Sequence, residues 1–263
     1  MGVEGLALAT FIAQALASVL SFVTLIVFVK KRVSNDKAII NFSLLKKVLP
    51  IAIPSIIQAS TISIGQLLIQ SLINKQGTDV VAGYGAAYKI SYVIINIFLT
   101  ISNALSTYVS QNAGAKEYKR IKQGFIAALI ICAALTVITT SLFLIMPETF
   151  LSIFEKKDEP LAVTVTGCMF LTTLAPFIFL MAIKIPCDGV LKGSKDMLCF
   201  MIGTLADLII RVACSYLLID KLGVKGIFIS WPIGWAVGAL ISVTCYFIGR
   251  WKKLIGYQKT DLS

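Results

Sequence analysis

The first candidates for chemistry are ionisable residues that lie inside long apolar runs. Asp207 and Arg211 stand four residues apart, as do Lys184 and Asp188, whereas Lys89 has no acidic residue at that spacing. Residues four apart share one face of a helix, so each pair can neutralise its own charges. Charged groups inside a bilayer are costly unless they pair, and they mark structural anchors or ion paths. We expect Asp207 and Arg211 to fix two helices together.

The residue types of the sequence give no indication of enzyme activity. The chain has no histidine, and its six cysteines include no CxxC spacing. The usual Ser/His and Cys/His catalytic arrangements and HExxH metal sites are therefore excluded. We expect no enzyme activity, no metal site and no cofactor, with the cysteines acting as small apolar residues.

A stripe of polar side chains marks the second apolar run. Four of its polar residues fall within roughly 80° of arc at 3.6 residues per turn, which places them on one helix face. Such a stripe either joins helices or lines a water-filled cavity. We favour a substrate cavity, because contacts between helices in lipid usually use fewer and smaller side chains. The predicted lining residues are Ser63, Gln66, Gln70 and Asn74, together with Lys89 of the next run.

The elements that carry these residues are membrane-spanning helices. Hydrophobic residues make up 57% of the 263 residues and charged residues only 14%, whereas soluble domains carry about a quarter. About 20 apolar residues span a bilayer, and runs of this length are too long for barrel strands. The sequence predicts an all-α polytopic membrane protein with spans at 6–29, 47–74, 80–110, 123–146, 161–187, 197–219 and 224–249.

The net charge of +11 indicates how the chain is oriented in the membrane and does not indicate nucleic-acid binding. Lysine and arginine concentrate in alternate connectors, the pattern left when positive residues stay in the cytoplasm. We predict a multi-pass protein of the cell membrane with a cytoplasmic C-terminus. Met1 would then lie outside, so the chain resembles part of something longer. The predicted cytoplasmic connectors are 30–46, 111–122, 188–196 and the tail after Arg250, and the external ones are 75–79, 147–160 and 220–224.

Prolines and glycines interrupt several of the predicted spans. Interior prolines free backbone carbonyls, and in lipid these must be met by neighbours or by cavity water, so several of them favour helices that bend during transport. Gly234 and Gly238 form a GxxxG spacing that permits a close helix contact. The prolines are Pro50 and Pro54, which open the second span, Pro176, Pro186 and Pro232.

The order of short motifs resembles the C-terminal half of the multidrug and toxic compound extrusion (MATE) family. Gln111-Asn-Ala-Gly-Ala115 followed by Arg120 is similar to the family's marker at the cytoplasmic end of its eighth helix. The other matching segments are Gly2-Val-Glu-Gly-Leu-Ala-Leu-Ala-Thr10, Leu49-Pro-Ile-Ala-Ile-Pro-Ser55, Gly77-Thr-Asp-Val-Val-Ala82, Leu191-Lys-Gly-Ser-Lys-Asp196 and Gly226-Ile-Phe-Ile-Ser-Trp-Pro232.

This resemblance implies a twelve-helix transporter with two six-helix lobes, of which the chain would hold helix six and the second lobe. The implied domains are 1–46, a span with the interlobe loop, 47–250, the second lobe, and 251–263, a cytoplasmic tail. The implied activity is antiport of organic cations or drugs against H⁺ or Na⁺ by alternating access. Some branches carry coupling carboxylates where Ile62 and Met181 stand here, so the coupling site is expected in the missing first lobe. The implied partners are the lipid bilayer, small organic cations and that N-terminal lobe.

Two alternatives to a drug antiporter stay open. A lipid-linked oligosaccharide flippase of related architecture would need many basic residues in its cavity, and only Lys89, Lys184 and Arg211 are candidates. The second alternative is a nonfunctional fragment of a longer gene product.

Overall fold

Seven membrane-length apolar helical segments occur in the computed structural model, which describes residues 3–32, 42–153 and 160–256. They confirm the predicted multi-pass helical protein, and each agrees with its predicted range to within several residues. The segments are Ala7–Phe28, Val48–Asn74, Thr78–Gly114, Tyr118–Ile145, Leu161–Gly193, Met197–Leu222 and Val224–Ile248. Parts of the predicted connectors 30–46 and 147–160, and the tail after residue 256, lie outside the described residues.

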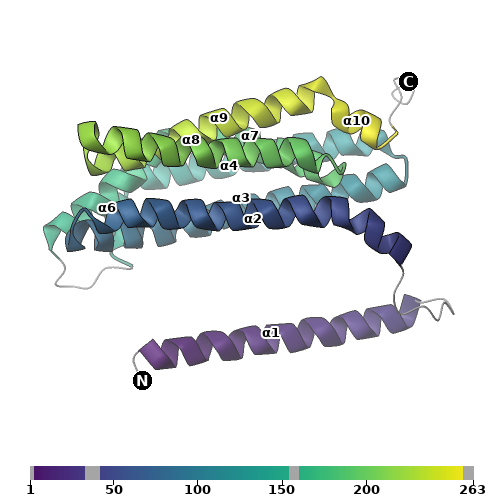
Figure 1. Ribbon diagram of the computed structural model, residues 1–263, viewed down its shortest axis with the longest axis horizontal. Coiled ribbons are helices and arrows are strands. Elements are labelled where there is room, and N and C mark those ends of the chain that lie inside the picture. The colour runs from purple at the N-terminus through teal and green to yellow at the C-terminus, as the bar shows by residue number, and fades with distance from the viewer. Residues whose placement is uncertain (1–2, 33–41, 154–159, 257–263) are drawn as a thin grey trace. The chain divides into compact units, whose positions relative to one another are not determined.

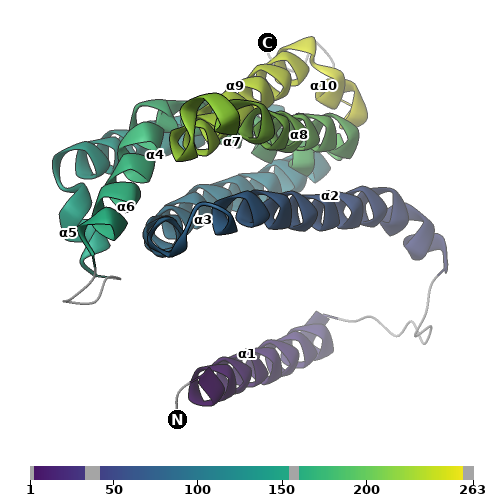
Figure 2. The ribbon, with the colours of Figure 1, turned by 60° about the vertical axis from the view of Figure 1, so that its left-hand side comes forward.

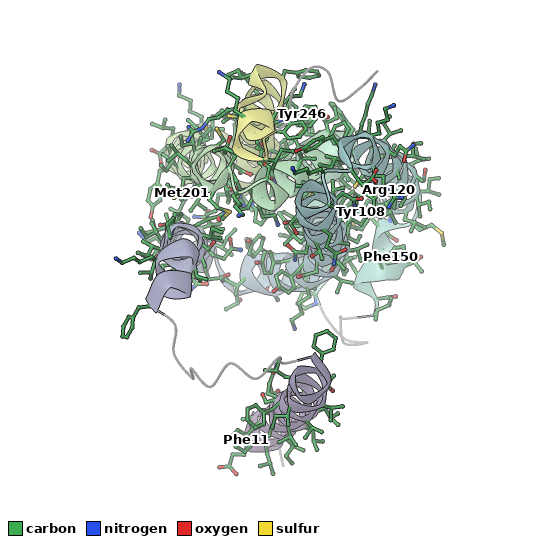
Figure 3. The ribbon with its side chains drawn as sticks, turned by 90° about the vertical axis from the view of Figure 1, so that its right-hand side faces the viewer. Phe11, Tyr108, Arg120, Phe150, Met201 and Tyr246 are labelled. Atoms are coloured by element: carbon green, nitrogen blue, oxygen red, sulfur yellow. The ribbon has the colours of Figure 1, made fainter. Side chains whose placement is uncertain are left out.

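The chain divides into two units, residues 1–47 and 48–263. The first unit contains helix α1, Val3–Arg32. Its 30 residues give a length of about 45 Å, more than the roughly 30 Å of a bilayer's hydrocarbon core. Large apolar side chains of α1 are exposed within this unit, among them Phe11, which Figure 3 labels. Their burial therefore depends on lipid or on other protein surfaces.

The second unit is a bundle of long helices with short turns (Figures 1 and 2). Its centre is α7, in which twelve of sixteen residues are buried, and which packs against α3, α4 and α9. Helices α8 and α9 form a tightly packed hairpin. The elements are α2 Phe42–Asn74, α3 Thr78–Gly114, α4 Tyr118–Ile145, α5 Pro147–Leu151, α6 Leu161–Leu174, the 3-10 turn η1 Ala175–Phe177, α7 Ile178–Gly193, α8 Met197–Leu222, α9 Val224–Ile248 and α10 Arg250–Leu254.

The fifth span is interrupted in its middle and ends later than predicted. Pro176 lies in η1, between α6 and α7, because proline has no backbone N–H for a helical hydrogen bond. The Thr140 hydroxyl of α4 donates to the Ala175 carbonyl at 3.0 Å and stabilises this break. Helix α7 then continues to Gly193, not to residue 187. Asp188, expected at a span end, instead lies more than one turn inside the helix.

Gly193 explains why α7 can continue so far along α3. A Cβ at this position would lie 2.5 Å from the Ser106 carbonyl oxygen and 2.7 Å from the Val109 Cβ. Both distances are shorter than non-bonded contacts allow, so only glycine permits the two helices to approach this closely.

Pro50 and Pro54 lie at the start of the second span, Val48–Asn74, as predicted, although helix α2 itself begins earlier, at Phe42. Pro186 and Pro232 lie inside α7 and α9, as predicted. Whether these helices bend during transport stays a prediction.

Two connectors are much shorter than predicted, because both helices before them end in the same hydrogen-bonded turn. Residues 115–117 join α3 to α4, and residues 194–196 join α7 to α8, in place of the predicted 111–122 and 188–196. In the first turn, the Glu117 N–H donates to the Asn112 carbonyl at 2.8 Å and the Lys116 N–H to the Ala113 carbonyl at 3.1 Å. The second turn repeats both bonds, from Asp196 to Leu191 and from Lys195 to Lys192, at 2.9 and 3.1 Å.

This pattern is the Schellman motif, which satisfies the last carbonyls of a helix and requires a left-handed residue. That residue is usually glycine, but here it is Lys116 (φ 61°) and Lys195 (φ 67°). A lysine in this conformation costs about 1 kcal/mol relative to glycine. Because the left-handed residue is a lysine, each turn places a basic side chain at the end of the membrane-spanning helices.

Candidate functional site: a paired ionic core and two polar helix faces

Both predicted charge pairs form ion pairs inside the second unit. The Lys184 Nζ lies 2.7 Å from the Asp188 Oδ2, and the Arg211 NH2 lies 2.8 Å from the Asp207 Oδ1. The side chains are 14% exposed or less. In each pair one helical turn separates the partners, so the pairing is local to α7 and to α8.

Helix α9 brings the two pairs together. A Cβ at Gly238 would lie 2.9 Å from both the Asp207 Cβ and the Lys184 Cε, so α7, α8 and α9 converge at this glycine. At Gly234 a Cβ would lie 2.7 Å from the Asp207 Oδ1. The Ser242 hydroxyl donates to the Asp188 Oδ1 at 2.6 Å, on the opposite carboxylate oxygen from Lys184. The GxxxG spacing is thus a close helix contact, as the sequence permits.

The four side chains form a neutral ionic core, defined as Lys184, Asp188, Asp207 and Arg211. Two positive and two negative charges share one buried region, so no net charge is desolvated there. A buried pair of this kind adds little stability by itself, but removing one partner leaves an uncompensated charge. The ion pairs themselves lie within single helices, contrary to the expectation that Asp207 and Arg211 fix two helices together; the contacts between helices are the Ser242–Asp188 hydrogen bond and the close packing at Gly238.

An aromatic series connects Arg211 to the surface of the bundle. The Arg211 Cζ lies 4.5 Å from the centre of the Trp231 ring, a cation–π contact. Trp231 meets Tyr88 at 6.0 Å between ring centres, and Tyr88 meets Tyr92 at 6.0 Å. Tyr92 is 54% exposed. The series runs from a buried guanidinium to an exposed aromatic ring on α3.

The predicted polar stripe of α2 lies on a face that the second unit leaves open in part. Ser63 and Asn74 are exposed, and Gln66 and Gln70 are half-buried. The Gln70 Nε2 donates to the Asn74 Oδ1 at 2.8 Å, and the Ser63 hydroxyl donates to its own helix. Another face of α2 packs inward, where a Cβ on Gly65 would lie 2.5 Å from the Leu208 side chain of α8. Whether the stripe lines a cavity or joins helices stays a prediction.

Helix α3 carries a second polar stripe that we did not predict from the sequence. Its members recur every three or four residues over about four turns, so they lie on one helix face. Hydrogen bonds within the helix hold several of them, such as Thr100 to the Asn96 carbonyl at 2.8 Å. The period of 3.6 residues among Asn, Thr and Ser was the signal available in the sequence. The stripe consists of Asn96, Thr100, Asn103, Thr107 and Ser110.

Lys89 and Tyr92 lie at the start of this α3 stripe, and Lys89 is exposed. In the middle of the stripe, the Lys192 Nζ of α7 donates to the Asn103 Oδ1 at 2.8 Å. Hence the predicted cavity residue Lys89 shares a helix face with polar groups, whereas Lys184 and Arg211 are buried and paired. The positions of the coupling carboxylates implied by the resemblance hold Ile62, 39% exposed on α2, and Met181, buried in the core.

The family model described as MatE matches residues 54–217 of this chain. The chain belongs to the MatE family. This confirms the resemblance found in the sequence motifs.

The MatE chain is similar to relatives along most of its length. It is 23% identical to the probable multidrug resistance protein YoeA of Bacillus subtilis (strain 168), over 96% of this chain and 55% of that protein. It is 28% identical to the probable multidrug resistance protein NorM of Pasteurella multocida (strain Pm70), over 81% of this chain and 46% of that protein. The chain thus spans about half the length of the curated relatives it matches.

Solved MATE structures share the fold. A MATE structure in the bent conformation matches with a TM-score of 0.76 and 19% identity, over 90% of this chain and 52% of its own. An inward-facing multidrug resistance MATE transporter of the MOP superfamily matches with a TM-score of 0.69 and 19% identity, over 91% of this chain and 57% of that transporter chain. The match to about half of a transporter agrees with one six-helix lobe and the helix that precedes it.

Proposed function

We propose that this chain forms one half of a secondary active antiporter that exports organic cations or drugs in exchange for H⁺ or Na⁺ by alternating access. The observation that carries the proposal is the pair of polar faces on α2 and α3. Polar side chains facing lipid are costly, so faces of this length in membrane-spanning helices need water or protein beside them. In transporters with two repeats, the substrate site lies at the interface between the repeats.

Aromatic side chains on α3 further support a cationic substrate. Tyr92 and Tyr88 offer ring faces beside the α3 stripe, and such faces attract organic cations.

The coupling ion is proposed to bind in the other lobe. An exchanger needs a group whose occupancy biases two conformations. Among the described residues of the second unit, Asp188 and Asp207 are the carboxylates deep in a span, and both are held in ion pairs. A carboxylate already neutralised by a lysine or an arginine is a poor carrier for H⁺ or Na⁺. A partner lobe is therefore proposed to supply the coupling acid.

Membrane location and orientation complete the proposal. We place the chain in the cell membrane with its C-terminus in the cytoplasm, because the basic connectors alternate with connectors poorer in basic residues. The end of the second unit that carries α10 and the two Schellman turns would face the cytoplasm.

Efflux of a fluorescent organic cation tests the function. Cells that make this chain with a first lobe taken from a relative such as YoeA should export the dye, and an uncoupler or sodium removal should abolish export. Cells that make the chain without a first lobe should insert it but show no driven efflux. Driven efflux by the chain without that lobe would contradict the two-lobe proposal.

The structure supports the flippase alternative less than the sequence does. It needs basic residues in the cavity, and two of its three candidates, Lys184 and Arg211, are buried in ion pairs. The same cells separate the two functions, since a flippase would leave the dye inside and translocate a lipid-linked sugar.

A further inference from the structure

A pocket of about 240 Å³ lies where the start of α4 meets the end of α9 and α10. The α4 side contributes Tyr118, Ile121 and Lys122. The other wall consists of Tyr246, Phe247, Trp251 and Lys252. Figure 3 looks along the bundle from this end and labels Tyr246 and Arg120. The pocket begins one helical turn beyond Ser242 on α9, and none of its lining residues is assigned to transport above.

The walls of the pocket are held in place by several contacts. Gly249 adopts a left-handed conformation (φ 74°), which ends α9 and turns α10 back toward the bundle. The Trp251 Nε1 then donates to the Tyr246 carbonyl at 2.9 Å, and the two rings stack at 5.6 Å. Tyr246 also stacks on Phe125 of α4 at 4.5 Å, and the Tyr118 hydroxyl donates to the Ile255 carbonyl at 3.2 Å. The pocket is therefore a built feature rather than a gap between mobile side chains.

The charge around the pocket is strongly positive. Lys122 and Lys252 line it, and the same two helix segments carry further basic side chains. The acidic residues nearby are engaged, since Glu117 lies 3.9 Å from the Arg120 Nε and Asp196 lies 3.7 Å from the Arg250 Nε. The additional basic residues are Lys119 and Lys253, together with Arg120 and Arg250, which face those two carboxylates.

The position of the pocket indicates a lipid rather than a soluble ligand. Tyrosine and tryptophan concentrate at membrane–water interfaces, and lysine clusters there attract anionic lipids. The apolar side of the opening continues onto Phe247 and Ile248, which are 77% and 72% exposed on a membrane-spanning helix. A volume of about 240 Å³ is below the roughly 300–1,000 Å³ of pockets for drug-sized ligands, which suits a headgroup but not its acyl chains. The chains would lie outside, along α9.

We propose that this pocket binds the phosphate-bearing headgroup of an anionic phospholipid, with Lys122 and Lys252 as the ligands of the phosphate. The aromatic side chains Tyr246 and Trp251 hold the glycerol region at the interface. A lipid bound there would join α4 to α10 and thereby stabilise the end of the bundle.

Quenching of tryptophan emission by brominated lipid tests the proposal, because Trp251 lines the pocket. The full chain is purified in phosphatidylcholine-containing micelles and titrated with phosphatidylglycerol that carries brominated acyl chains. The double variant K122Q/K252Q should need about 25-fold more phosphatidylglycerol for half-maximal quenching, since each of the two lysines contributes about fivefold near a membrane surface. The matched control K221Q/K225Q removes two exposed lysines from the opposite end and should titrate like the unmodified chain.

Three results would overturn the proposal. The first is equal titration of K122Q/K252Q and the control, with both variants folded by circular dichroism and gel filtration. The second is equal quenching by brominated phosphatidylcholine, which would mean that headgroup charge has no role. The third is displacement of the lipid by millimolar inorganic phosphate, which would assign the pocket to a soluble phosphate compound.

Discussion

Removing one member of the Asp207–Arg211 pair should destabilise the protein far more than removing both. In Asp207→Asn, the Arg211 guanidinium keeps its position over Trp231, 4.5 Å from the ring centre, but loses its carboxylate. Lys184 lies on the other side of Gly238, so the region gains a net positive charge. Breaking a buried pair in this way costs about 3–5 kcal/mol of unfolding free energy.

The double variant D207N/R211Q restores neutrality and leaves two amides that can bond to each other. Its unfolding free energy should therefore fall by less than that of Asp207→Asn. The coupling energy of the pair, taken from the full mutant cycle, should be about 2 kcal/mol or more. The measurement is equilibrium unfolding of the purified chain in mixed micelles of increasing dodecyl sulfate content, followed by tryptophan emission.

A matched control is the Glu117–Arg120 pair at the start of α4. These side chains are 53% and 61% exposed, and the closest N–O distance is 3.9 Å. An exposed pair contributes only about 0–1 kcal/mol, so E117Q and R120Q should be nearly additive. If the Asp207–Arg211 cycle were also additive to within about 0.5 kcal/mol, the ionic core would not be a coupled unit and our reasoning would be refuted.

Four further predictions follow from the same structure. Gly238→Ala places a Cβ 2.9 Å from Asp207 and Lys184, so it should lower the unfolding free energy by about 1–3 kcal/mol, whereas Gly85→Ala, with open space around its Cβ, should cost less. Lys195→Gly removes a left-handed lysine and should raise the unfolding free energy by up to about 1 kcal/mol; a loss would contradict the strain argument. A cysteine at position 119 should react with an impermeant thiol reagent only from the cytoplasmic side, and labelling from outside intact cells would reverse the topology. Cysteines placed on the polar faces of α2 and α3 should react with hydrophilic thiol reagents faster than cysteines placed on other faces of α2. Equally slow reaction of both sets would mean that the polar faces join helices. The polar-face positions are 63, 66, 70, 74, 100 and 103, and the comparison positions are 57, 64, 68 and 72.

Much of the fold could be predicted from the sequence, because local physics decides it. An apolar run of about 20 residues must form a helix in lipid, so all seven spans were found without knowledge of their packing. The two ion pairs were also predictable, since a spacing of four residues brings side chains together on any helix. Family membership followed from short motifs in the right order.

The candidate site was predicted only in part. The stripe of α2 was found, but the stripe of α3 was missed, although Asn96, Thr100 and Thr107 carry the same helical period. Lys89 was recognised as a single charge and not as the first member of that face. Its assignment, and that of the α2 stripe, to a substrate cavity stays a prediction.

Tertiary packing decided what no spacing could show. Gly238 joins Lys184 and Asp207 because three helices converge there, and a sequence does not state which helices meet. The pocket between α4 and α10 combines Lys122 with Lys252, two residues far apart in the chain, because the left-handed Gly249 turns the chain back onto the bundle. The sequence by itself determines the helices, since each satisfies its own backbone in lipid. Only the tertiary structure decides which of their side chains share a buried core, a polar face or a pocket, because those contacts depend on how the helices pack against one another.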